Sequence, residues 1–249
     1  MSRRTRETSV GMENHMKRWF VTLGAALLVA AGSAAPARAI GPIFDWDPAY
    51  FWFGAPATYN NQPLGTPLLA VGTISAFGAP VEFLNATMPA TEYTFYIQGL
   101  TSQGTTSALG FHTTYYSGGT FEMYADNSPD AVFAPNPPNA QVPSTFLDGG
   151  APLLTGVFTS FVVNTNDVTT FQVGSIEGNI QWTGGSLLTY LYGPNSEPCP
   201  GLFTGGSTWR TTPGVGIPGY IFRHDGKIDL QCPTPAAKST WGRLKSLYR

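Results

Sequence analysis

Short segments of alternating hydrophobic and polar residues, separated by turn residues, make up most of the chain after its first forty positions. In "TEYTFYIQGL", Tyr93, Phe95 and Ile97 occupy every second position, which is the period of a strand with one buried face. No long helical pattern occurs before the end of the chain. The alternation predicts strands at 68–77, 80–87, 92–99, 107–116, 120–125, 153–164, 169–182, 186–192, 203–210, 219–224 and 227–232.

This many short strands in one chain favours an all-β fold, and we predict an antiparallel β-sandwich of jelly-roll type with a short C-terminal helix. The 29 Gly and 21 Pro among 249 residues agree with a fold that needs many turns. The aromatic and acidic segment "FDWDPAYFWFG" (44–54) is interpreted as a first strand buried in the core. The alternative is an exposed platform on which sugars stack.

Two pairs of residues indicate hairpin turns. Asp225-Gly226 is a strong signal for a two-residue turn, which would separate the last two strands and leave His224 exposed at its mouth. Gly118-Gly119 predicts a second turn, with His112 as a half-buried sheet residue on the preceding strand. The longest irregular stretch, 126–150, is rich in proline and is interpreted as a strand crossover, with a functional loop as the alternative.

The N-terminal segment has the layout of a secretory signal peptide. Lys17 and Arg18 precede an apolar run at 20–31, and "ARA" (37–39) supplies a cleavage site. We therefore assign 1–39 to the signal peptide, with Met1 or Met16 as the start, and expect export to the periplasm, cell surface or exterior. Residues 40–232 are assigned to a single sandwich domain and 233–249 to a linker and basic tail.

The expected export to an oxidising compartment bears on the state of the two cysteines. An even pair in an exported protein is typical of a disulfide, so Cys199 and Cys232 are predicted to be bonded. A free pair or a metal site is the alternative.

Charge is distributed unevenly along the chain. After residue 39 there are thirteen acidic and seven basic residues, and all seven basic residues fall at 210–249. The body of the protein is therefore acidic and lacks the clustered Lys and Arg that binding to phosphate requires, which argues against nucleic acid as a partner.

Catalytic motifs are missing from the sequence. It contains no HExxH, no Cys-x-x-Cys, no G-x-S-x-G and no phosphate loop. A glycosidase needs two carboxyl groups about 5–9.5 Å apart, whereas Glu122 and Asp126 on one strand would be roughly 13 Å apart. Glu92 or Glu177 could still meet Glu122 across the sheet. We predict a non-enzymatic protein and keep a glycoside hydrolase as the third hypothesis.

Two candidate binding sites remain. Asp126, Asn127 and Asp130 offer the hard oxygen ligands that Ca²⁺ prefers, although their spacing is not that of an EF-hand, and an Asx turn is the simpler interpretation. The side chains of Tyr115, Glu122 and Tyr124 share a predicted hairpin face that would suit a sugar or another ligand.

The tail carries its own candidate contact. A short helix there would place Trp241, Leu244 and Tyr248 on one side, with basic residues elsewhere. A frayed or docked tail is the simpler interpretation, and the alternative is a recognition element for an envelope or export component. Its candidate residues are Trp241, Arg243, Leu244, Lys245 and Arg249.

Three segments, "YYSGGTFEMYADNSPDA", "FLDGGAPLLTGVFTSF" and "GNIQWTGGSLL", resemble secreted bacterial β-sandwich proteins of the PEP-CTERM and choice-of-anchor type. The likeness covers about 111–188. Those proteins usually end in a proline-containing motif, an apolar span and a basic cluster; here Pro233-Thr234-Pro235 and the basic end lack the span between them. The resemblance implies an exported surface or matrix protein and transfers no catalytic residue.

The leading hypothesis is thus an exported, non-enzymatic protein with a structural or adhesive role at the cell surface, in the periplasm or in an extracellular matrix. The alternative is a carbohydrate-binding module, with Ca²⁺ as its only candidate cofactor and a polysaccharide as its partner.

Overall fold

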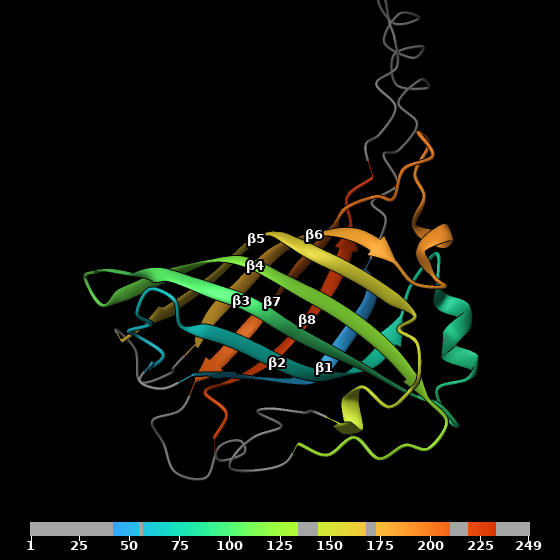
Figure 1. The fold of residues 1–249 in the computed structure, drawn as a ribbon, viewed down its shortest axis with the longest axis horizontal. Coiled ribbons are helices and arrows are strands. Elements are labelled where there is room, and N and C mark those ends of the chain that lie inside the picture. The colour runs from blue at the N-terminus through green and yellow to red at the C-terminus, as the bar shows by residue number, and fades with distance from the viewer. Residues whose placement is uncertain (1–41, 55–56, 134–143, 168–172, 210–218, 233–249) are drawn as a thin grey trace, which may run out of the picture. The chain divides into compact units, whose positions relative to one another are not determined.

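Eight antiparallel strands form a closed barrel in the computed structural model (Figure 1). The structure describes residues 42–54, 57–133, 144–167, 173–209 and 219–232. It divides into two units, 1–39 and 40–249, and all described residues belong to the second. The strands are β1 (Pro42–Phe53), β2 (Pro67–Phe77), β3 (Glu92–Ala108), β4 (Phe111–Asp126), β5 (Leu154–Asn166), β6 (Val173–Gly184), β7 (Gly201–Trp209) and β8 (Phe222–Leu230).

The barrel corrects the predicted sandwich. Each strand pairs with its neighbours in sequence, and β1 also pairs with β8, from Pro42 opposite Asp229 to Phe51 opposite Phe222. This last ladder joins the two ends of one sheet, so the two separate sheets of a sandwich do not exist. Alternation along single strands is the same in both architectures and therefore did not separate them.

The predicted C-terminal helix falls at 233–249, outside the residues that the structure describes. The helical segments of the described residues are three short 3₁₀ turns, η1 (Glu82–Ala86), η2 (Ser144–Phe146) and η3 (Leu188–Leu191). Residues 233–249, with all five candidate residues of the tail, lie outside the described part. Among the described residues there is no helix with the length and apolar character needed to span a membrane.

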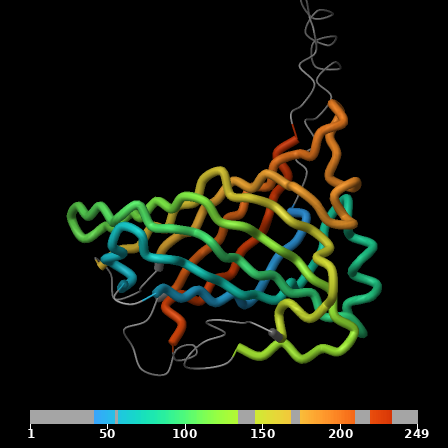
Figure 2. Tube along the Cα trace, viewed as in Figure 1, coloured from blue at the N-terminus to red at the C-terminus, as the bar shows by residue number. Residues whose placement is uncertain are grey.

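Several strand boundaries differ from the prediction. The segments 80–87 and 186–192 contain η1 and η3 instead of strands. Gly118-Gly119 forms no hairpin turn, because β4 continues through it. The turn lies at Leu109-Gly110, where both residues have positive φ, 51° and 78°. The β3–β4 hairpin is consequently long and extends past β2, whose pairing with β3 ends at Thr101 (Figure 2).

The Asp225-Gly226 turn is wrong as well, because β8 runs through it without interruption. Gly226 lies opposite Gly205 on β7 and Trp46 on β1. A Cβ atom at Gly226 would lie 2.7 Å from the Trp46 ring and would overlap the carbonyl oxygen of Thr204. The glycine is thus needed for close packing inside the barrel, and His224 is fully buried instead of exposed.

Aromatic side chains fill the interior of the barrel. Trp46 stacks on Phe203 with ring centroids 4.4 Å apart, and Phe95 stacks on Phe121 at 5.4 Å. Inward-facing glycines make room for these rings: a Cβ at Gly72 would overlap Phe95. The core interpretation of 44–54 is confirmed, since its inward residues are buried. The interior is a packed core, as in small barrels filled by side chains.

A second apolar cluster lies on the outside of β1, β2 and β3. Its strand residues include Trp52, Val71 and Tyr96, and Phe146 of η2 together with Phe133 covers them. The described parts of the connection between β4 and β5 therefore serve as a cover for the outer surface. The predicted strand crossover is wrong, because β4 and β5 are direct neighbours in the barrel.

The barrel has two ends that differ in chemistry. The disulfide rim carries the β2–β3, β4–β5 and β6–β7 connections and the Cys199–Cys232 disulfide, which confirms the predicted pairing. The hairpin rim, at the opposite end, carries the β1–β2 connection and the β3–β4 hairpin. Near the hairpin rim lie the buried polar side chains Gln62, Ser102, His112, Thr114, Thr165 and Ser207.

Candidate functional site

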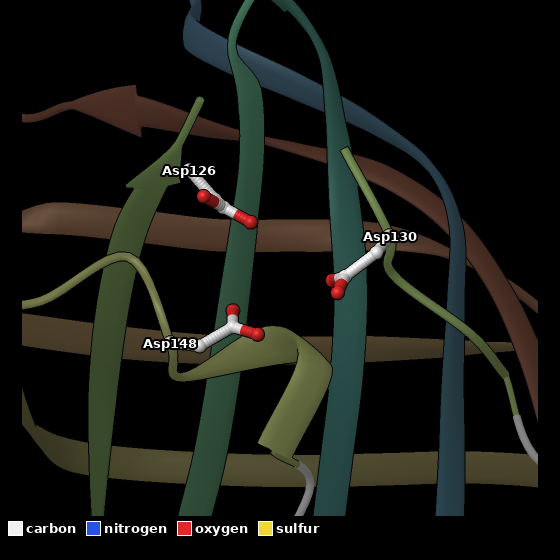
Figure 3. Close-up of side chains that lie close together, drawn as sticks. All are labelled: Asp126, Asp130 and Asp148. Atoms are coloured by element: carbon white, nitrogen blue, oxygen red, sulfur yellow. The ribbon is translucent and has the colours of Figure 1, made fainter. Parts of the chain in front are cut away.

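Three aspartates from two connected segments meet at the disulfide rim. Asp126 ends β4, Asp130 follows it in the β4–β5 connection, and Asp148 comes shortly after η2 (Figure 3). One carboxylate oxygen from each lies within 4.8 Å of the others. The structure thus brings together the predicted Asp126 and Asp130 and adds Asp148. We refer to these three residues as the aspartate cluster.

Hydrogen bonds from the main chain hold the cluster's loop in place. Oε2 of Glu92 accepts hydrogen bonds from the backbone N–H groups of Asp130 and Ala131, at 3.1 and 2.8 Å. Oδ1 of Asp126 accepts one from the backbone N–H of Ser128 at 2.9 Å, which is the predicted Asx turn. The amide oxygen of Asn127 accepts a hydrogen bond from the hydroxyl of Thr91, so this oxygen is already engaged.

The electrostatics of the cluster favour a bound cation. Desolvation within the loop, and then the charges of Asp148 and Asp126, raise the pKa of Asp130. The sequence from Ile40 to Trp209 contains no Lys or Arg that could offset this repulsion. Carboxylate oxygens at such spacing fit the hard-ligand preference of Ca²⁺, and the neighbouring carbonyls and water could complete its coordination.

The second predicted site, Tyr115, Glu122 and Tyr124, does not form one binding face. All three side chains lie on the outer side of β4, but Tyr115 is 59% exposed whereas Tyr124 is buried. The hydroxyl of Tyr124 donates a hydrogen bond to Glu122 at 2.9 Å. Burial, followed by this hydrogen bond, raises the pKa of Tyr124. Tyr115 lies seven residues from Glu122, roughly 23 Å along a strand.

The register also bears on the glycosidase hypothesis. Glu92 lies opposite Asp126, while the partner of Glu122 on β3 is Tyr96. Glu177 belongs to β6 and is separated from β4 by β5. Neither Glu92 nor Glu177 is therefore the direct cross-strand partner of Glu122.

A hydrogen-bonded chain at the hairpin rim was not predicted from the sequence. Oγ of Ser107 lies 2.7 Å from Nδ1 of His112, and Nε2 of His112 lies 2.8 Å from Oδ2 of Asp167. The hydroxyl of Tyr59 donates to the other oxygen of Asp167 at 2.8 Å. Hydrogen bonds from His112, and then from Tyr59, lower the pKa of Asp167. We call Tyr59, Ser107, His112 and Asp167 the rim clasp.

The rim clasp has the residue types of a serine hydrolase triad, and its hydrogen bonds tie the β1–β2 connection to β3, β4 and the residue after β5. Ser107 and His112 face each other across the β3–β4 ladder. Asp167 follows β5, and Tyr59 belongs to the β1–β2 connection, which also bonds Thr165 through the backbone oxygen of Tyr59 at 3.1 Å. The geometry therefore supports a structural role, in which the clasp holds the β1–β2 connection over the end of the barrel.

Replacing Asp167 by Asn should destabilise the protein by about 1 kcal/mol, because the charged acceptor of His112 is lost from a site that remains partly in water. Urea unfolding at neutral pH measures the change. Asp47→Asn is the matched control, since the Asp47–Arg223 ion pair is about half exposed on both sides and should contribute less than about 0.5 kcal/mol. Equal losses in the two variants would contradict the role of the clasp.

Comparison with protein-family models, with curated proteins and with solved structures finds no match. The class of the protein is therefore defined by its own structure, as a closed eight-stranded antiparallel barrel with a filled interior and one disulfide.

Proposed function

We propose that this is an exported, non-enzymatic barrel protein with a structural or adhesive role at the cell surface, in the periplasm or in an extracellular matrix. The observation that carries the proposal is the filled interior. Trp46, Phe95, Phe121 and Phe203 occupy the space in which a larger barrel would hold a small molecule. Partners must therefore be bound through the outer surface and the rims.

Three further observations support export. The Cys199–Cys232 disulfide is typical of proteins in an oxidising compartment. The segment 1–39 has the composition of a signal peptide, and the resemblance to sorted surface proteins points in the same direction. The acidic body disfavours nucleic acid and anionic lipid as partners.

Deletion of residues 2–39 should leave the protein inside the producing cell with Cys199 and Cys232 reduced. The full chain should instead be recovered outside the cytoplasm, processed after Ala39. Cell fractionation, intact-mass measurement and thiol labelling test this prediction. Recovery of full-length, unprocessed chain from the cytoplasm would contradict it.

The tail is tested by a separate deletion. Removal of residues 233–249 should change the location of the exported protein if Trp241, Arg243 and Lys245 are read by an envelope or export component. Replacing only the basic residues of the tail by Gln is the matched control for loss of charge. An unchanged location for both variants would eliminate the tail as a sorting element.

The second candidate function is calcium-dependent binding of carbohydrate, and the aspartate cluster is the observation that favours it. Ca²⁺ would bind Asp126, Asp130 and Asp148 and link the end of β4 to the segment after η2, next to a surface on which a polysaccharide could bind.

Calcium should raise the thermal stability of the protein progressively as its concentration increases above the Kd. At a concentration one hundred times its Kd it should stabilise the fold by about 2.7 kcal/mol. Calorimetry with increasing CaCl₂ measures the effect, with MgCl₂ as the ionic control because Mg²⁺ demands a tighter octahedral site. Asp148→Asn should remove the response, whereas Asp47→Asn should retain it. Equal responses to both cations, or in both variants, would contradict a specific site.

A further inference from the structure

An open pocket of about 300 Å³ lies at the disulfide rim, a site that the sequence did not indicate. One wall is formed by β5 and β6, with Thr159 and Gln181. The other wall is the 193–200 segment that leads into β7, with Asn195 and Glu197. This volume is at the lower end of the range for small-molecule sites, and it suits a ligand of about one ring.

The 193–200 wall is fixed before any ligand arrives. The backbone N–H of Gly193 donates to the carbonyl of Glu197 at 2.8 Å, and that of Cys199 donates to Leu191 at 2.8 Å. A Cβ atom at Gly193 would lie 2.8 Å from Sγ of Cys199, so the segment packs directly on the disulfide. Because the wall is already ordered, binding should require little further loss of conformational entropy.

The lining combines polar side chains with the apolar rings of prolines. The side chains of Gln181, Asn195 and Glu197 are exposed and form no hydrogen bond with the described part of the chain, so their donors and acceptors are available to a ligand. Two amides and a carboxylate can donate to and accept from neighbouring hydroxyl groups. Pro194, Pro198 and Pro200 add apolar ring surfaces to the same pocket.

The charge of the lining narrows the class of ligand further. Glu197 carries the one formal charge among the described residues that line the pocket, and it is negative. Phosphate, sulfate and uronic acid groups would therefore be repelled. A pyranose ring has both features that the lining requires, hydroxyl groups at its edge and an apolar C–H face for the proline rings.

We propose that this pocket binds one neutral hexose unit of a polysaccharide, an inference that rests on the adhesive function proposed above and identifies its ligand. The pocket is partly open to solvent, so the remainder of a polysaccharide chain can continue away from the protein. The aspartate cluster is a different set of residues and is not required for this contact.

Titration of the full chain, labelled with ¹⁵N, with glucose, galactose, mannose and their neutral tetrasaccharides tests the proposal. With at least one of these sugars, the amide signals of residues 193, 195–197, 199 and 181 should shift in a saturable manner. Asn195→Ala and Glu197→Gln should each weaken the affinity about tenfold, the equivalent of one lost hydrogen bond. Gln98→Ala, which removes an exposed amide on β3, should leave the affinity unchanged.

The possible outcomes distinguish a failure of the pocket assignment from a failure of the proposed adhesive function. If the protein retains binding to insoluble neutral polysaccharide in both pocket variants, or if the shifted signals lie elsewhere, the adhesive function stands and the pocket assignment is overturned. If the wild-type protein binds none of the soluble sugars and no insoluble polysaccharide, both proposals fail. Thermal unfolding of each variant confirms that the exposed substitutions leave the fold intact.

Discussion

Acidification from pH 7 to 4 is expected to destabilise the wild-type barrel by about 3 kcal/mol more than a His224→Gln variant. His224 is fully buried, and burial lowers its pKa from 6.5 to about 3. Between these two values the unfolded chain binds a proton that the folded protein does not bind. The free energy of unfolding therefore falls as the pH decreases through this window, by about 1.4 kcal/mol per pH unit.

The surroundings of His224 explain why its imidazole ring stays neutral in the folded protein. The indole N–H of Trp46 donates to Nδ1 at 3.1 Å, so this nitrogen is an acceptor and Nε2 carries the hydrogen. The ring lies parallel to Phe203, at 5.8 Å between centroids, inside the aromatic core. Protonation would place a hydrogen on Nδ1 against the indole N–H and would bury a charge.

Urea unfolding of both proteins at several pH values between 7 and 4 measures the difference. Gln retains an acceptor for Trp46 and does not titrate, and His224→Phe is a second variant that preserves ring packing. Both variants keep His112 and all carboxylates, so the contributions of those groups cancel in the comparison. Parallel stability curves for wild type and both variants would contradict the buried, neutral state of His224.

Removal of the disulfide should cost about 3–4 kcal/mol, the value expected for a link between residues 33 positions apart. Cys199 precedes β7 and Cys232 follows β8, and these two strands are paired from Gly201 opposite Leu230. The bond thus restricts the unfolded chain across the last hairpin of the barrel. In the folded protein it also supports the 193–200 segment.

The double variant Cys199→Ser/Cys232→Ser, unfolded in urea, tests this expectation. The wild-type protein in excess reducing agent should fall to the same stability as the variant, and the reducing agent should leave the variant unchanged. A wild-type protein whose stability is the same with and without reductant would contradict the contribution of the bond.

The all-β class, the buried first strand, the disulfide and the proximity of Asp126 and Asp130 were predictable from the sequence because each depends on local pattern or on cysteine number. Closure of the barrel was not predictable, because it depends on the pairing of β1 with β8, at opposite ends of the chain. Alternation along a strand reports which face is buried. It does not report which strand lies alongside.

At Gly226, the packing of the barrel overrides a strong local sequence signal for a turn. Asp-Gly is favoured in tight turns because glycine adopts positive φ, but Gly226 is not among the residues with positive φ in this structure. Its role is to lack a side chain where Trp46 packs against the wall. An Asp-Gly pair can thus mark either a tight turn or a strand position without room for a side chain. Here the position of Trp46 shows that the second explanation applies.

Only some residues of the candidate sites were predictable, because the others come together through long-range folding. Asp148 and Asp167 reach their partners through the folding of connections, and neither lies in a motif with Asp126 or His112. A weak signal was available in the lack of Lys and Arg from residue 40 to 209. Acidic residues in such a body are balanced either by basic residues from the end of the chain, as Asp47 is by Arg223, or by histidine, hydroxyl donors or a bound cation.

The closed ladder between β1 and β8 has a consequence for solubility. Only 11% of the residues are charged, so mutual repulsion offers the protein little protection against self-association. An open sheet of the same composition would present unpaired N–H and C=O groups to its neighbours and would be prone to stack edge to edge. Because the barrel has closed on itself, its strands are paired on both sides, and an exterior rich in Thr, Ser and Asn with few charges does not expose a sheet edge to a neighbouring molecule.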